Sequence, residues 1–273
     1  MPAMYAHDRF GQDVITKLSG TLEELVTVER VAFDLGLQGP DLLYYYQPLL
    51  PNSIQKIGGR VHNMSGGRFL TRCAKVQRRE SNDQGLAYLM GSVCHYALDV
   101  ACHPIVEHRC KAGDFVHTEI EMAFDRALMV RDGLDPLTVA IGGNLETDGS
   151  FETEEVIAAF YPPLTPDHIA EAIRSARVFQ ELMLPQNEAK RALLQGATFL
   201  TGPAKRSLRG HIMSKKPIAA LQPTVQELAG AYTRALEETP AMLEEFLLAV
   251  YQKKQLGESF RLDYLGEKPQ KSE

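Results

Sequence analysis

The sequence predicts an all-α fold, a single domain built as a multi-helix bundle. Apolar residues recur at helical spacing over long stretches, as in the run Val225, Leu228, Ala229, Tyr232 and Leu236. The sequence contains no convincing alternating strand pattern and no internal repeat. An apolar fraction of 44% and a charged fraction of 23% are ordinary for a globular domain. We therefore expect one helical domain over residues 1–252, followed by a polar tail over residues 253–273.

Cap and breaker residues divide the chain into expected helices. These cover residues 6–19, 21–35, 67–79, 83–109, 114–132, 152–160, 165–184, 187–200 and 224–252. Gly20 separates the first two helices, and Asp83 and Asp114 are the expected N-caps of the fourth and fifth. Pro240 should kink or divide the last helix.

The remaining segments are expected to be irregular. Residues 36–41 read as a loop and residues 42–50 as a short apolar segment. Residues 53–67 are rich in glycine and carry His62, and residues 133–151 read as an exposed connection. From Lys253 onward the chain is polar and charged, which predicts a loosely ordered tail.

Composition narrows the functional classes. A net charge of −6 provides no basic footprint for duplex nucleic acid. The N-terminus lacks the cationic and apolar parts of a signal peptide, so we expect a cytoplasmic location with reduced thiols. Residues 86–102 are apolar enough to suggest a membrane span, but His95 and Asp99 would be costly in lipid, so we expect no transmembrane segment. Cys94 and Cys102 are interpreted as buried packing residues, with zinc ligation as the alternative.

Metal-competent side chains at helical spacing form the strongest signal. They are arranged as His95-x3-Asp99-x3-His103, followed by His117-x3-Glu121. Residues four apart lie on one face of a helix, so each set forms a stripe. Two such stripes packed together would direct imidazoles and carboxylates into one cleft, as in the metal sites of helical bundles. Asp125 continues the second stripe and either orients a ligand histidine or lies on a solvated face.

Three more residues join this set through their order in the chain, namely His7, Asp41 and His62. The complete series resembles the zinc-dependent phospholipase C family, which is related in fold to P1-type nucleases. The segments that carry the resemblance are Gly39-Pro40-Asp41, Tyr88 to Asp99 with the motif His95-x3-Asp99, His103-Pro104, and His117-Thr118-Glu119-Ile120-Glu121. It covers about residues 1–130, and beyond them only helical character and length agree.

The resemblance implies a centre with up to three zinc ions. His62, His95 and Asp41 would hold one ion, and Asp99 would bridge to a second ion bound by His7. The third ion would be held by His103, His117 and Glu121. Secreted family members complete the His7 site with an N-terminal tryptophan, and this chain has no tryptophan. Three, two or one bound ions therefore remain open, and manganese or iron could use the same ligands.

The expected function is a zinc-dependent hydrolysis of phosphoric esters, in which Asp41 orients or deprotonates the attacking water. The expected substrate is a small phosphate ester or a phospholipid headgroup. A P1-like nuclease and a catalytically inactive, metal-stabilised binding protein are the alternatives. The dipeptide His7-Asp8 also suggests an HD-type phosphohydrolase, but that family requires a preceding histidine that this chain lacks.

Overall fold

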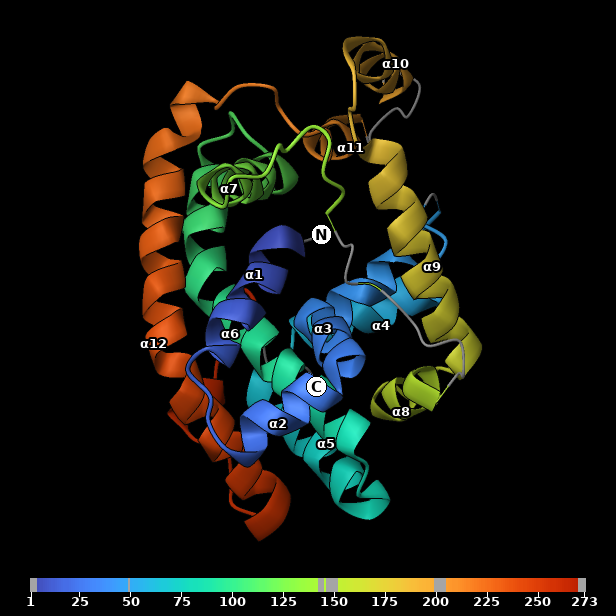
Figure 1. Ribbon diagram of the computed structural model, residues 1–273, viewed down its shortest axis with the longest axis vertical. Helices are drawn as coiled ribbons and strands as arrows, with labels where there is room; N and C mark the ends of the chain where they lie inside the picture. The colour runs from blue at the N-terminus through green and yellow to red at the C-terminus, as the bar shows by residue number, and fades with distance from the viewer. Residues whose placement is uncertain (1–3, 49, 142–144, 146–151, 199–204, 270–273) are drawn as a thin grey trace.

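The computed structural model describes residues 4–48, 50–141, 145, 152–198 and 205–269. Every regular element within these residues is helical, so the all-α prediction is confirmed (Figure 1). The elements are α1 Met4–Ile15, α2 Thr21–Val28, α3 Arg30–Gln38, η1 Gly39–Tyr45, α4 Ser53–His62, α5 Gly66–Glu80, α6 Asp83–Lys111, α7 His117–Arg131, α8 Glu152–Phe160, α9 Pro166–Met183, α10 Glu188–Thr198, α11 Lys205–Gly210, η3 Ala219–Leu221, α12 Gln222–Gln252 and η4 Glu258–Phe260.

Helix α6 is the central element. It packs against α1, α3, α5, α7, α8 and α12. Residues 85–99 of α6 are buried on every side, as expected for a helix that is apolar all round. Among the described residues, no helix is both long enough and apolar enough to span a membrane.

Two glycines allow α3 and α6 to touch through their backbones. A Cβ atom on Gly36 would lie 2.1 Å from the Tyr88 carbonyl oxygen, and one on Gly91 would lie 2.2 Å from the Phe33 carbonyl oxygen. Neither position can therefore hold a larger residue without moving a helix. This close crossing brings the end of α3 and the start of η1 onto the part of α6 that carries His95.

The glycine-rich segment over residues 53–67 was expected to be irregular, and this prediction is wrong. Ser53–His62 forms α4, whose first turn is capped by the Asn52 side chain, which accepts from the backbone N–H groups of Ile54 and Gln55. Glycine in a helix costs only about 1 kcal/mol, and this cap and the packing of α4 on η1 offset it. At Gly58 the glycine also lets the Pro40 carbonyl oxygen approach closely.

Several boundaries also differ from expectation. Asn82, not Asp83, caps α6 by accepting from Gly85 N, and Val116, not Asp114, is the residue before α7. Helix α12 runs through Pro240 without being divided. The short helix α11 was not expected. The connection over residues 133–151 lies partly outside the described residues, although Ile141 within it is buried rather than exposed.

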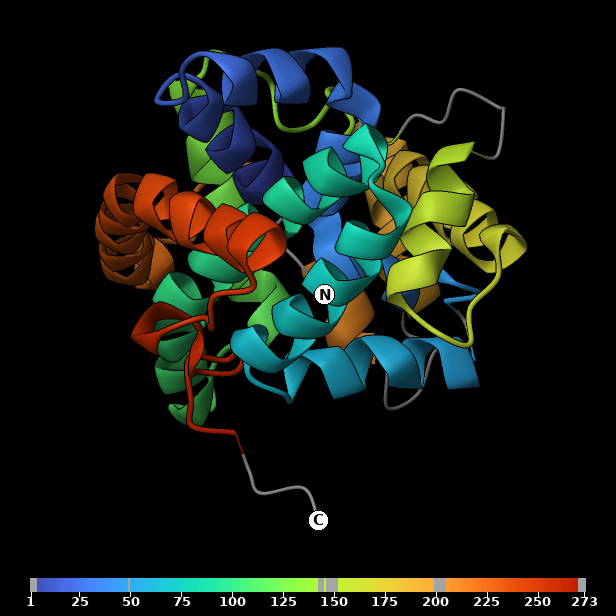
Figure 2. The same cartoon turned by 90° about the horizontal axis from the view of Figure 1, so that it is seen from below.

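Part of the chain after α12 is packed against the helices, so the prediction of a loosely ordered tail is wrong for that part, whereas residues 253–255 are exposed and irregular. Phe260 and Tyr264 are fully buried in this segment. The segment turns back beside α6, as Figure 2 shows in red and green. The sequence did not indicate this because the two buried aromatic residues are surrounded by charged ones.

Candidate metal centre

The eight residues predicted as metal ligands meet beside the middle of α6. They come from α1, η1, the last turn of α4, α6 and α7, and they are His7, Asp41, His62, His95, Asp99, His103, His117 and Glu121. All are buried except His117, whose side chain is 27% exposed. Polar groups at this depth need partners, so their convergence in one place requires a chemical explanation.

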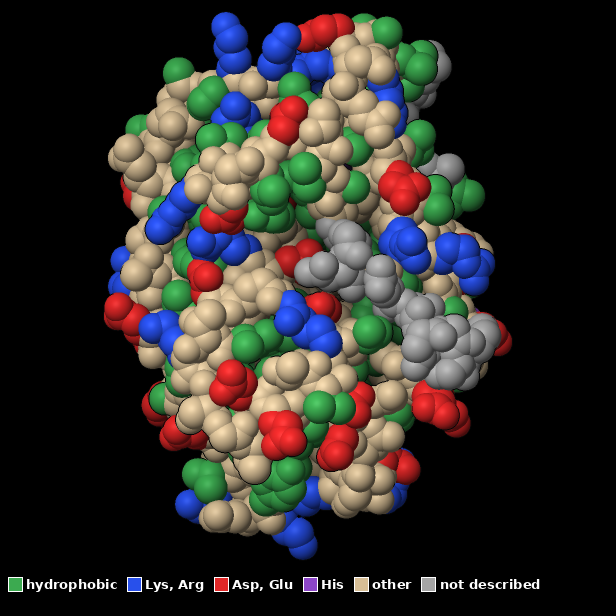
Figure 3. All heavy atoms as spheres, viewed as in Figure 1, with side chains coloured by type: hydrophobic (Ala, Val, Ile, Leu, Met, Phe, Trp, Pro, Cys, Tyr) green, Lys and Arg blue, Asp and Glu red, His purple; other side chains and the backbone are tan. Residues whose placement is uncertain are grey.

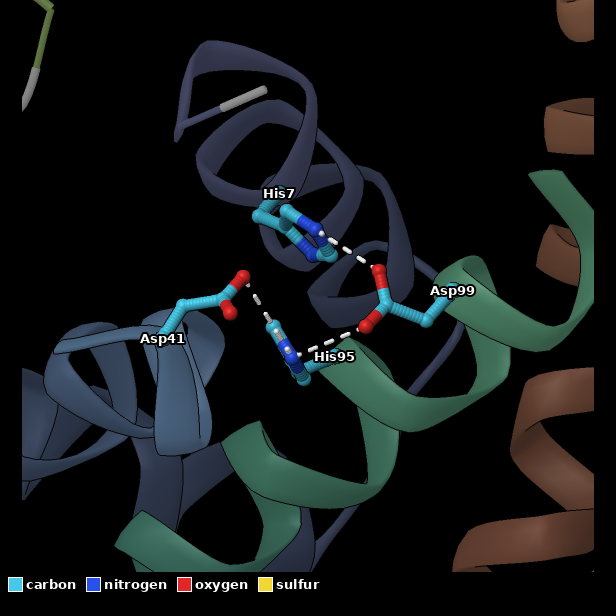
Figure 4. A group of neighbouring side chains, drawn as sticks. All are labelled: His7, Asp41, His95 and Asp99. Carbon is cyan, nitrogen blue, oxygen red and sulfur yellow. Dashed lines mark ion pairs between the residues drawn. The ribbon is translucent and has the colours of Figure 1, made fainter. Parts of the chain in front are cut away.

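The first group consists of His7, Asp41, His95 and Asp99 (Figure 4). One ligand atom from each of these residues lies within 4.8 Å of the others. The two Asp99 oxygens face different histidines, since Oδ1 lies 3.2 Å from His7 Nε2 and Oδ2 lies 3.1 Å from His95 Nε2. His62 adjoins this group, with its Nε2 2.8 Å from Asp41 Oδ1. Asp99 thus faces one histidine with each of its two oxygens.

The second group consists of His103, His117 and Glu121, again with one ligand atom each within 4.8 Å of the others. Glu121 Oε1 lies 2.9 Å from His117 Nε2 and 3.4 Å from His103 Nε2. The two groups are neighbours, because Asp99 Oδ1 is 3.7 Å from His103 Nε2. The structure therefore has two adjoining ligand groups.

The histidines are oriented so that their Nε2 atoms face the carboxylates. Three Nδ1 atoms contact backbone carbonyl oxygens: His62 to Gly58 at 2.9 Å, His95 to Leu37 at 3.0 Å and His103 to Tyr264 at 2.6 Å. The Nδ1 atom of His117 contacts a carboxylate oxygen of Glu107 at 3.0 Å. These oxygens can only accept, so Nδ1 carries the hydrogen. In a neutral imidazole, Nε2 then presents a lone pair, as metal-ligating histidines do.

Some of the facing atoms are buried without a hydrogen-bond partner among the described residues. They include His95 Nε2, Asp99 Oδ2 and Glu121 Oε2. Leaving a buried polar atom unsatisfied costs about 1–3 kcal/mol. A cation held between these atoms would satisfy them, and imidazole nitrogen with carboxylate oxygen is a ligand set that suits zinc. The residues present therefore fit a metal ion.

The electrostatics of the centre favour positive charge. Burial opposes ionisation of Asp99, but His103 and His95 outweigh it and hold the pKa of Asp99 well below its usual range. Burial likewise opposes protonation of His103, yet Asp99 and Glu121 raise its pKa to about 10. The carboxylates thus attract a compensating charge, which either protons on the histidines or divalent cations can supply.

Asp125 positions α1, which carries His7. Its side chain is fully buried and accepts from the backbone N–H groups of Tyr5 and Ala6, at 3.2 and 2.9 Å. These are donors at the N-terminus of a helix that have no partner within the helix. Of the two alternatives for Asp125, the solvated face is therefore wrong. Asp125 holds the N-terminus of the helix that carries His7, a predicted ligand.

Glu107 contacts a predicted ligand and was not expected from the sequence to belong to the site. Its Oε1 atom lies 3.0 Å from His117 Nδ1. A signal was present, because Glu107 follows His103 at the same four-residue spacing that joins His95, Asp99 and His103. The carbonyl of Tyr264 gave no such signal, since a backbone atom has no sequence pattern.

The two alternatives for the cysteines are also distinguished. Cys94 and Cys102 are buried, and neither belongs to a candidate ligand group in the described chain. Cys102 lines a small cavity of about 20 Å³ next to His7 and Glu121. What completes the His7 site is not among these contacts, and residues 1–3 lie outside the described part of the chain.

Comparison with known proteins adds no assignment, since no family model, curated protein or solved structure matches this chain. The resemblance to the phospholipase C family therefore depends on the quoted motifs alone.

Proposed function

We propose that the chain is a metal-dependent hydrolase of phosphoric esters that uses zinc, with a phosphodiester such as a phospholipid headgroup as its substrate class. One observation carries the proposal: four histidines present Nε2 to shared carboxylates while an oxygen acceptor holds each Nδ1. The order of the eight residues along the chain also supports it, because it follows the phospholipase C motifs.

Zinc bound here would lower the pKa of a coordinated water to about 7 and neutralise charge on a phosphoryl oxygen. The chain contributes the geometry. Asp41 approaches His62 through Oδ1, while its Oδ2 lies 3.8 Å from His95 Nε2. An ionised carboxylate in this position can accept a hydrogen bond from the attacking water and orient it.

The exposure of the eight side chains indicates from which side a substrate would reach the centre. His117 is the most exposed of the eight side chains, at 27%, so the second group is the open side of the centre. On the face seen in Figure 3, basic and acidic side chains are interspersed over the described residues. A small phosphate ester fits this surface better than duplex nucleic acid, which requires a continuous basic field.

Hydrolysis assays on zinc-loaded protein test this proposal. We expect turnover of bis(4-nitrophenyl) phosphate and of 4-nitrophenyl phosphorylcholine, and loss of both activities in His95→Ala. The control is His108→Ala, which changes an exposed histidine of the same helix. If the protein hydrolyses single-stranded oligonucleotide and neither of these small substrates, the proposal is wrong and the chain is a nuclease. Stoichiometric zinc without hydrolysis of any substrate would point to a metal-stabilised binding protein.

A further inference from the structure

The chain beyond α12 returns to the metal centre. We call residues 262–267 the C-terminal strap. The Leu262 carbonyl oxygen accepts from Gly66 N and from the Tyr96 hydroxyl, each at 3.0 Å. These contacts attach the strap to the first turn of α5 and to α6. Figure 2 shows the red chain beside a green helix. The strap is therefore part of the packed structure around the ligands.

Tyr264 contacts three of the predicted ligands. Its carbonyl oxygen accepts from His103 Nδ1 at 2.6 Å, and its backbone N–H donates to the His62 carbonyl oxygen at 3.1 Å. Its ring lies 5.1 Å from the His62 ring and 5.8 Å from the His95 ring, measured between centroids. One residue of the strap thus touches both ligand groups.

A tight turn sets the position of Tyr264. The Asp263 side chain accepts from the backbone N–H groups of Leu265 and Glu267, at 3.0 and 2.9 Å. Gly266 closes the turn with a φ of 73°, a conformation that favours glycine. The strap's own residues therefore fix the shape of this turn, while contacts with α5, α6 and His62 hold it in place.

Gly266 seats this turn directly on α6. A Cβ atom there would lie 2.6 Å from Pro104 Cγ and 2.9 Å from the Val100 carbonyl oxygen. Pro104 has no N–H group, so the Val100 carbonyl lacks its usual partner inside the helix. The strap packs at this turn of α6, between Asp99 and His103. Only glycine fits here.

We propose that Tyr264 is a positioning residue of the metal centre and that docking of the C-terminal strap and metal binding stabilise each other. This inference rests on the metal centre of the proposed function. It goes beyond that function by making the end of the chain a determinant of metal affinity. Thermodynamic linkage requires the coupling to be reciprocal, so metal ions must protect the strap and an undocked strap must weaken metal binding.

Limited trypsin digestion of the wild-type chain tests the first direction. Arg261 immediately precedes the strap, and its side chain is 69% exposed. We expect cleavage after Arg261 to be at least about 10-fold slower with zinc than with a chelator, because cleavage requires the strap to detach. Cleavage after Lys17, in the exposed loop between α1 and α2, is the reference and should change little.

Gly266→Ala tests the second direction without altering a ligand. We expect zinc affinity to fall by about 10-fold to 100-fold, as for other residues that orient a ligand histidine. We also expect a changed visible absorption spectrum of the cobalt-loaded protein, because the His103 ring would shift. The matched control is Gly133→Ala, which has a similar φ of 77° but open space around the added Cβ. It should keep the wild-type affinity and spectrum.

Tyr264→Phe gives a second variant that retains the ring and the carbonyl oxygen, and it should behave like the wild type. Two results would overturn the strap inference alone, provided that the wild type binds zinc. One is a zinc affinity and cobalt spectrum in Gly266→Ala equal to those of the wild type. The other is a rate of cleavage after Arg261 that does not depend on zinc. Failure of the wild type to bind zinc would overturn both this inference and the proposed function. Hydrolysis without any effect of the strap would leave the proposed function intact.

Discussion

At the scale of single residues, four of the five imidazoles of the centre are held in place through their Nδ1 atoms. A carbonyl or carboxylate oxygen holds Nδ1 of four histidines, and Nε2 is thereby directed inward. This arrangement determines the tautomer as well as the ring orientation. The chemistry of the centre therefore depends on groups that are not themselves ligands.

Replacing a predicted ligand should have an effect that replacing an exposed histidine of the same helix does not have. We predict that His103→Ala loses metal from the second group and reduces phosphodiester hydrolysis by more than about 100-fold, since an open ligand position cannot be filled by another side chain. Metal analysis and steady-state kinetics measure both effects. His108→Ala, an identical change on the exposed side of α6, should retain both properties. Equal loss in the two variants would contradict the assignment of His103.

Replacing Glu107 should weaken the centre without removing a ligand. In Glu107→Gln the His117 Nδ1 atom loses a charged acceptor, so we predict a zinc affinity lower by about 10-fold. Competition with a zinc indicator measures this change. Glu24→Gln, an exposed change on α2, is the control and should leave the affinity unchanged. An unchanged affinity in Glu107→Gln would show that the contact does not matter for binding.

Sequence reasoning succeeded for residues whose side chains form a pattern. His95, Asp99, His103, His117 and Glu121 share helical spacing, and all of them meet in the structure. The contacts from carbonyl oxygens could not be predicted, because any residue can supply one and only the fold brings it near.

At the scale of elements, α6 supplies three of the predicted ligands and the surface on which the others are assembled. Its close crossing with α3 brings η1 and Asp41 within reach of His95. Helix α1 is held by its N-terminal N–H groups, which bond to Asp125 on α7. The first and second ligand groups are thus linked through helix ends as well as through side chains.

We predict that Asp125→Ala lowers the free energy of unfolding by about 1–3 kcal/mol, because one buried and one partly buried N–H group lose their acceptor. Burial raises the pKa of Asp125 well above its usual range, so its own desolvation cost partly offsets the loss. Urea unfolding measures the change. Asp167→Ala, an exposed acidic residue in the first turn of α9, should cost less than about 1 kcal/mol. Similar losses in both variants would argue against a specific role of Asp125.

Helices such as α6 and α12 were predicted because apolar residues recur at helical spacing along much of their length. Helix α4 was missed because Gly58 and Gly59 weaken its helical signal, while the stabilising cap comes from Asn52 outside it. The strap was missed for a related reason. Its order depends on Tyr264 packing against residues that are distant in the sequence.

At the scale of the whole molecule, the centre connects the beginning, the middle and the end of the chain. Ligands or their supports come from α1, η1, α4, α6, α7 and the C-terminal strap. A metal ion bound only by the folded state stabilises it by an amount set by its concentration relative to Kd. Metal binding should therefore contribute to the stability of the entire fold.

We predict that chelation lowers the melting temperature by about 10 °C, which follows from about 4 kcal/mol for one ion at a thousandfold excess over its Kd. Scanning calorimetry with and without chelator measures the shift. The same comparison on His95→Ala should give a smaller shift, since one ligand group is incomplete. A melting temperature that does not respond to chelation in the wild type would contradict this view.

Binding of divalent metal by the eight converging residues can be measured by metal analysis of the purified chain. After saturation with zinc and removal of the excess, we expect at least one ion for each of the two ligand groups. We also expect His95→Ala and His103→Ala each to lose bound zinc. A wild-type chain that holds no stoichiometric metal and cannot be told from either variant would show that these residues do not form a metal centre.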